Sequence, residues 1–181
     1  MEDSDVPTEH LHEEIHHHVK PGERWTLGVA LTSALLAALA AITSLKSGHY
    51  ANEAMLAQIQ CADKWSYYQS KSIKAAQLTS KMEILEALGK PIEEKDRHKA
   101  DEYKSEQEEI KTRAETLQAE AKQHLRKHEV FAKGVTLFQV AIAIAAISVL
   151  AQRRRFWFVS MGFGAVGVFF LLEGLLIHSA Q

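Results

Sequence analysis

Three long runs of apolar residues alternate with polar segments along the 181-residue chain. The runs cover residues 25–45, 134–152 and 156–177, and the only charged residue inside any of them is Glu173. A helix rises about 1.5 Å per residue, so about 20 residues cross the hydrocarbon core of a bilayer, which is about 30 Å thick. Because lipid offers the backbone no hydrogen-bond partner, such runs must be helical. Each run is therefore predicted to be a transmembrane helix.

The charged segment between the first two spans, residues 46–133, shows a different period. A turn is predicted near residues 89–91, where Gly89 is followed by Lys90 and Pro91. Seven-residue spacing is typical of a coiled-coil seam and appears on both sides of this turn, at Ala54, Cys61, Tyr68, Ala75 and Met82, and at Tyr103, Ile110, Leu117, His124 and Phe131. The fold class that follows is an all-α membrane protein with three transmembrane helices. A long antiparallel coiled-coil helical hairpin is expected between the first and second of them, after a polar tail at residues 1–24.

Small residues recur on one face of the third span, at Ser160, Gly164, Gly167 and Gly174. Residues 162–167 also spell G-x-G-x-x-G, but a dinucleotide site needs a strand before that motif, and this one lies inside an apolar span. Small residues let helices approach closely in lipid, so this face is predicted to pack against another helix. The Ala-rich hairpin seam buries little area, so further copies of the chain are expected to add burial and form a homo-oligomer.

Glu173 is an acid inside a predicted span, which makes it a candidate functional residue. It lies 17 residues beyond Phe156, so about 25 Å along the helix, close to the far interface. The preferred interpretation is an interfacial carboxylate that reaches water or a partner such as His178. A position in the pore of an oligomeric channel is the alternative.

The N-terminal tail contains H-E-x-x-H at residues 12–16, the spacing with which zinc proteases bind their metal. A protease needs a folded domain to supply a third ligand and a cleft, and a polar tail of 24 residues has none. Catalysis is therefore not expected. A weaker hypothesis is that the tail binds a divalent metal or senses pH. Its candidate ligands are His12, Glu13, His16 and His17.

Charge gives an orientation and limits the class of partner. The net charge of −2 does not indicate nucleic-acid binding. The loop between the last two spans is Arg153-Arg154-Arg155, and short loops rich in arginine stay in the cytoplasm. The N-terminus is then cytoplasmic, and the hairpin lies on the opposite side. Cys61, the only cysteine, would report that side if it is accessible to a thiol reagent.

Residues 48–76 carry a distinctive sequence that includes Asn52-Glu53-Ala54, Gln58-Ile59-Gln60 and Asp63-Lys64-Trp65-Ser66-Tyr67-Tyr68-Gln69. This stretch, with the order of tail, span, charged region and paired spans, resembles a bacterial membrane-protein family, domain of unknown function 4337. The resemblance implies location in the bacterial inner membrane and implies no activity. In that membrane, the orientation given by the three arginines places the hairpin in the periplasm. Trp65, Tyr67 and Tyr68 are read either as large packing residues of the seam, which is preferred, or as a recognition surface.

No catalytic constellation, cofactor site or small-molecule substrate is identifiable in the sequence, so an enzyme is not expected. The preferred hypothesis is a non-enzymatic, homo-oligomeric scaffold in the inner membrane, whose partners are the lipid bilayer and other copies of itself. The alternatives are the channel with Glu173 at its pore and the metal or pH sensor based on the histidine tail.

Overall fold

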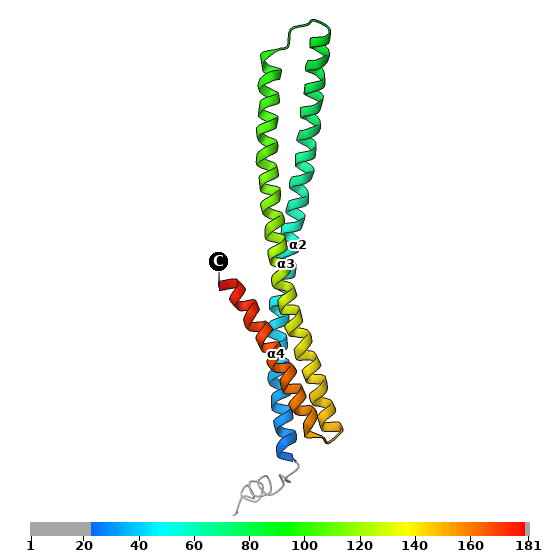
Figure 1. Cartoon of the computed structure of the whole chain (residues 1–181), viewed down its shortest axis with the longest axis vertical. Coiled ribbons are helices and arrows are strands. Elements are labelled where there is room, and N and C mark those ends of the chain that lie inside the picture. Colours follow the sequence, from blue (N-terminus) through cyan, green and yellow to red (C-terminus); the bar gives the residue numbers. More distant parts are fainter. Residues whose placement is uncertain (1–22, 180–181) are drawn as a thin grey trace, which may run out of the picture. The chain divides into compact units, whose positions relative to one another are not determined.

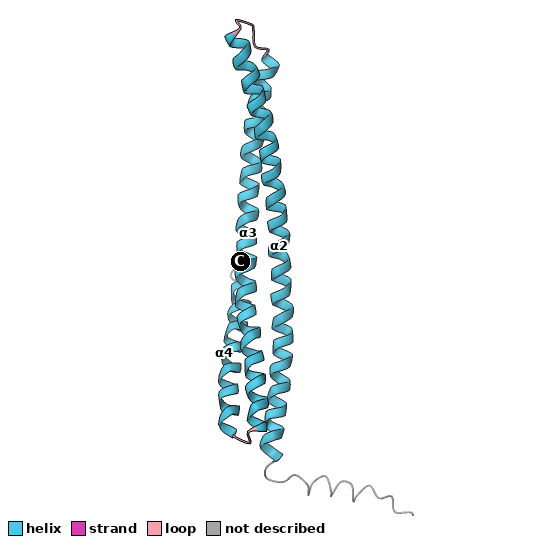
Figure 2. Ribbon diagram, turned by 90° about the vertical axis from the view of Figure 1, so that its right-hand side faces the viewer, coloured by secondary structure: helices cyan, strands magenta, loops and turns pink. Residues whose placement is uncertain are grey.

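The structure is a computed structural model that describes residues 23–179, and in that range three helices are joined by two short connections. Helix α2 runs from Glu23 to Ala87, α3 from Glu94 to Leu150, and α4 from Arg154 to Ser179 (Figure 1). Figure 2 shows no strand among the described residues. All three helices are long and apolar enough to cross a membrane, as expected of a multi-pass membrane protein. The predicted N-terminal tail lies outside the described residues, except for its last two positions.

The chain divides into two compact units, each described here by itself. The apolar unit consists of the described residues within Met1–Lys46 and Val130–Gln181, and the polar unit consists of Ser47–Glu129. Helix α2 contributes to both units, and so does α3, while α4 belongs to the apolar unit alone.

The core of the apolar unit is made by all three helices. Leu36 and Ala40 of α2 and Phe138 and Ala141 of α3 are buried together, and Val168 of α4 packs against them. Phe138 is completely buried, which shows how closely the helices approach around it. A cluster of this size fixes the facing sides of the helices, while most other large apolar side chains of the unit remain exposed, as lipid-facing side chains would be.

In the polar unit, parts of α2 and α3 lie side by side (Figures 1 and 2). As the residue numbers rise along α2, those of their contact partners on α3 fall. The four contacts are Ser47 with His128, Cys61 with Ala114, Lys71 with Glu106, and Lys81 with Asp96. Burial is confined to one part of the unit. It includes Ala54, Cys61, Ala114 and Leu117, whereas no side chain between residues 62 and 109 is fully buried. The predicted seam residues Tyr68, Ala75 and Met82 are therefore only partly covered.

Both connections between helices begin with the same hydrogen-bonded helix end. At the end of α2, the Lys90 amide donates to the carbonyl of Leu85, and the Gly89 amide donates to that of Glu86. This is the Schellman motif, which needs a left-handed residue, and Gly89 has φ of 65°. Pro91 then keeps the chain from continuing as a helix.

The end of α3 repeats the motif with a less suitable residue. The Arg153 amide donates to the carbonyl of Ser148, and the Gln152 amide donates to that of Val149. Gln152 occupies the left-handed position with φ of 50°. A side chain there brings Cβ close to the following carbonyl oxygen, so Gln152 carries a cost that Gly89 avoids.

The two helix ends predict opposite effects of exchanging glycine and a larger residue. Gly89→Ala should lower the free energy of unfolding by about 1–2 kcal/mol, because alanine is strained in the left-handed region. Gln152→Gly should raise it by about 1 kcal/mol for the converse reason. Thermal unfolding in detergent followed by circular dichroism measures both. Gly89→Asn is the control and should lose less than Gly89→Ala, since asparagine tolerates this conformation. Equal melting temperatures for all four proteins would contradict the assignment.

Candidate functional site

The small residues predicted on the third span lie on one buried face of α4. Ser160, Gly164, Gly167 and Gly174 are all buried, and Leu171 lies on the same face. Their spacing of three, four and seven residues places them along one side of a helix. The structure thus brings together the whole set that the sequence singled out.

This face is filled by side chains of the same chain. A Cβ atom added at Gly167 would lie 2.8 Å from a ring carbon of Phe138, and one at Gly174 would lie 2.6 Å from the ring of Phe131. At Gly164 the same atom would meet Leu36 at 2.8 Å. The glycines therefore receive two aromatic rings of α3 and one leucine of α2. The face is used to close the apolar unit and is not free for another copy.

Two polar contacts hold the first half of α4. The Ser160 hydroxyl donates to the carbonyl of Ala141 at 2.7 Å, and the Trp157 indole donates to the Thr32 hydroxyl at 3.2 Å. Their donors are one turn apart on α4 and reach α3 and α2 respectively. Hydrogen bonds between helices add to packing where water is excluded, so these contacts fix α4 against both neighbours.

Glu173 lies in the last two turns of α4, next to Gly174, and its side chain is partly exposed. Gly174 faces Phe131, so Glu173 projects from the neighbouring side of the helix. Its predicted partner His178 belongs to the helix end, where side chains are not described. The position agrees with a carboxylate near the end of a span, and no described contact links it to a path through the unit.

Trp65, Tyr67 and Tyr68 lie on α2 without being fully buried. Trp65 and Tyr68 meet edge to face, with ring centroids 5.5 Å apart, and Tyr67 is 48% exposed. Tyr67 lines a surface groove together with Ile110 of α3, which is buried. Trp65 and Tyr68 are only half-buried, so the rings lie beside the contact between the helices and are not enclosed by it.

Lys71 connects these aromatics to α3. Its amine is 2.5 Å from the Glu106 carboxylate and lies 5.5 Å and 5.3 Å from the ring centroids of Tyr67 and Tyr103. The hydrogen bond to Glu106 raises the pKa of the Lys71 amine above its ordinary value, and the one with Tyr67 acts in the same direction. Lys71 is thus held as a cation between two tyrosines.

A cluster of polar residues at the other end of the polar unit was not predicted as a site. His128 places Nδ1 3.0 Å from the hydroxyl and 2.9 Å from the carbonyl oxygen of Ser47. The rings of Tyr50 and His124 stack with their centroids 6.1 Å apart. Lys127 is buried, with 3% of its surface exposed, and its amine lies 5.5 Å from the Tyr50 ring centroid. The signal in the sequence was the pair His124 and His128, which share a helix face at i, i+4. These groups join α2 to α3.

The remaining candidate residues give a plainer result. His12, Glu13, His16 and His17 lie outside the described residues. Within the described part of the chain, no three histidine, cysteine or acidic side chains are grouped to hold a metal ion. Cys61 is 2% exposed and donates a weak hydrogen bond to the carbonyl of Ala114 at 3.4 Å. The expectation that Cys61 could report its side of the membrane fails for this reason, since a buried thiol is a poor target for a maleimide.

The glycine face predicts a contrast between two neighbouring substitutions. Gly167→Ala should destabilise the apolar unit by about 1–3 kcal/mol, because the new methyl group overlaps the fully buried Phe138 ring. Gly162→Ala is the matched control, since a Cβ atom there has no neighbour within 4 Å. Thermal unfolding in detergent measures both. A Gly167→Ala melting temperature equal to or above that of Gly162→Ala would show that α4 does not pack as described.

Comparison with known proteins adds a family and no activity. A family model described as a domain of unknown function (DUF4337) matches residues 25–177, which include nearly all of α2, α3 and α4. No curated protein and no solved structure matches the chain. The match contains the distinctive stretch 48–76 and all three apolar runs, as the sequence resemblance indicated. The chain belongs to the family of the domain of unknown function 4337.

Proposed function

We propose that the protein is a non-enzymatic scaffold of the bacterial inner membrane, and that it assembles as a homo-oligomer through its polar unit. The observation that carries this proposal is the exposure of large apolar side chains in that unit. Met55, Ile59, Ile73 and Ile84 are 62%, 53%, 60% and 60% exposed. All four lie in the segment between the first two apolar runs, which is too rich in charge to lie in lipid. Burying one such side chain fully is worth about 1.5–3 kcal/mol, so covering them favours association.

The reciprocal run of contacts between α2 and α3 supports an antiparallel coiled-coil hairpin as the scaffold element. It extends from Ser47 and His128 to Lys81 and Asp96. The inner contacts use small residues such as Ala57 and Ala114, which bury little area each. Such a hairpin is weak as a single copy, so assembly would stabilise it. Small-residue faces in the spans were also expected to join copies, but the face on α4 is occupied within the chain, which leaves this role to the polar unit.

Side chains with acid–base chemistry take part in helix packing, which supports a structural role. His128 is hydrogen-bonded to Ser47, and the ion pairs are those of Lys71 with Glu106 and of Lys81 with Asp96. The hydrogen bond to Asp96 raises the pKa of the Lys81 amine above its ordinary value. Each pair links α2 to α3, and a scaffold needs such links to keep its two helices in one alignment.

Assembly can be tested on the whole protein. Native mass spectrometry in a mild detergent should show a complex of more than one copy, because covering the exposed apolar side chains makes the free energy of association favourable. Mass photometry at nanomolar concentration is the second measurement. A particle of one copy in both, across several detergents and in nanodiscs, would refute the homo-oligomeric scaffold.

The orientation follows from the connection between α3 and α4. Arg153 ends it, and Arg154 and Arg155 are the first residues of α4, so the sequence expectation of a three-arginine loop is corrected to a loop end and a helix start. The positive-inside rule assigns this cluster of arginines to the cytoplasm. Two spans separate the N-terminus from these arginines, so the N-terminus is also in the cytoplasm, and the polar unit, which is one span away from them, is in the periplasm. Arg154 also lies 5.8 Å from the Trp25 ring centroid, and both residue types favour the membrane interface.

Labelling an exposed position tests this orientation. Ser105 lies on α3 and is exposed, unlike Cys61. Ser105→Cys in a Cys61→Ser background should react with a membrane-impermeant maleimide in intact spheroplasts, and Cys61→Ser alone should not. Labelling that appears only after the inner membrane is opened would place the polar unit in the cytoplasm.

A further inference from the structure

One face of α2 in the polar unit carries no charge along most of its length. It is a row of nine positions spaced by three or four residues: Met55, Ile59, Ala62, Ser66, Gln69, Ile73, Ala76, Ser80 and Ile84. All nine positions of the row are exposed, and none is charged. Eight charged residues occur elsewhere on α2 between Ser47 and Ala87. We call this row the charge-free face of α2.

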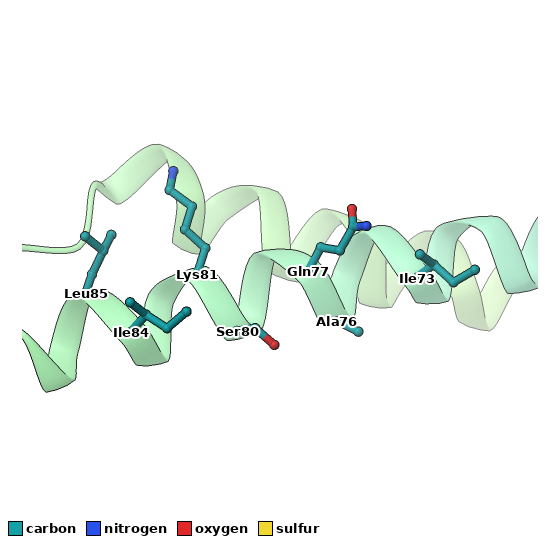
Figure 3. Close-up of a pocket in the computed structure, with 7 residues that line it drawn as sticks. All are labelled: Ile73, Ala76, Gln77, Ser80, Lys81, Ile84 and Leu85. Atoms are coloured by element: carbon teal, nitrogen blue, oxygen red, sulfur yellow. The ribbon is translucent and has the colours of Figure 1, made fainter.

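The lysine nearest to this face is turned away from it. A shallow groove near the turn is lined by residues of the face, including Ile73, Ser80 and Ile84, and also by Lys81. Figure 3 shows Ala76 and Ser80 pointing away from the neighbouring helix, toward which Lys81 points. There the Lys81 amine pairs with Asp96 at 2.6 Å. The face therefore stays uncharged even where a long cationic side chain could have covered it.

The neighbouring helix offers no exposed uncharged row of this length. Between Glu94 and Glu129, 19 of the 36 residues of α3 are charged, and they are distributed around the helix. A face of isoleucine, alanine, serine and glutamine would strip water from such charges without pairing them, which is costly. The surface of the polar unit that matches the charge-free face of α2 is the same face on another copy.

Symmetry then fixes how two copies meet. Copies inserted with one topology in one membrane are related by rotation about an axis along the membrane normal. A contact between identical faces is isologous, so the axis is twofold and each residue near it lies opposite itself. We propose that two copies of this chain pack α2 against α2 in parallel through their charge-free faces, with Ile59, Ile73 and Ile84 opposite the same residues of the second copy. This inference rests on the proposed homo-oligomer and names its interface.

The size of the face fits a small interface. The 30 residues from Met55 to Ile84 extend about 45 Å along the helix, and a helix is about 10 Å wide. A strip of this size is about 450 Å² on each copy, or roughly 900 Å² for the pair, which is the size of a weak interface between proteins. Seven-residue repetition of apolar and small side chains is also the pattern with which helices pair.

Cysteine cross-linking in native membranes tests the parallel arrangement. Ser66→Cys and Ser80→Cys, each in a Cys61→Ser background, should form disulfide-linked dimers under a mild oxidant, since facing residues bring Cβ atoms within the roughly 4 Å that a disulfide needs. Ser105→Cys on exposed α3 is the matched control and should remain monomeric on a non-reducing gel. Dimers from Ser105→Cys and none from either α2 variant would overturn the proposed interface.

A charge placed on the face tests its energetic role. Ile73→Lys should convert the wild-type complex to smaller particles in native mass spectrometry, while Thr112→Lys, on an exposed position of α3, should leave it intact. Ile73 is 60% exposed, so the helical circular dichroism of the variant should be unchanged. If the complex stays intact in Ile73→Lys and the α2 cysteines do not cross-link, the α2 interface is refuted but the homo-oligomeric scaffold is not. If the wild-type protein contains a single copy, both the interface and the homo-oligomeric scaffold are refuted.

Discussion

The rings of Phe131 and Phe138 occupy the space that Cβ atoms would fill at Gly174 and Gly167 of α4. In lipid the hydrophobic effect does not drive helices together, so their contact depends on van der Waals packing and on hydrogen bonds. Two flat rings seated on two glycines give many atom contacts over a short length of helix. The Ser160 and Trp157 hydrogen bonds then hold the same helix from its first turns. Gly134 completes the approach, because a Cβ atom there would lie 3.4 Å from the carbonyl oxygen of Gly167.

The polar unit holds its helices together in another way. Four of its ten buried residues are alanines, and Ser47 and Cys61 are also small, so many of its contacts contribute little. The ion pairs of Lys71 and Lys81 lie in the stretch that has no buried side chain, where solvent weakens them, whereas the aromatic contact of Tyr50 with Lys127 is buried. The two units therefore differ in what they require. The apolar unit needs space at glycine positions, whereas the polar unit leaves large apolar side chains exposed, which is the basis of the proposed assembly through α2.

Much of this arrangement could be predicted from the sequence, because its strongest signals are local. Apolar runs of about 20 residues indicate spans, Gly89 before Pro91 indicates a turn, and the spacing of Ser160, Gly164, Gly167 and Gly174 indicates one helix face. What fills that face could not be predicted, since Leu36, Phe131 and Phe138 are distant in sequence. Phe131 was assigned to the hairpin seam by its seven-residue spacing, yet it packs on Gly174 in the apolar unit. Periodicity identifies a buried side but not the partner that buries it.

The uneven burial of the polar unit sets an order for its local opening. Its fully buried residues lie before residue 62 and after residue 109, and the stretch that leads to Gly89 has only partly covered side chains. Segments with few buried contacts open at lower free energy than the rest of a fold, so amide hydrogens near the turn should exchange first. The ion pairs of Lys71 with Glu106 and Lys81 with Asp96 occur in this loosely packed stretch. Partly exposed pairs add little to stability, but both pairs require the same alignment of the two helices, and so they favour that alignment each time the helices close.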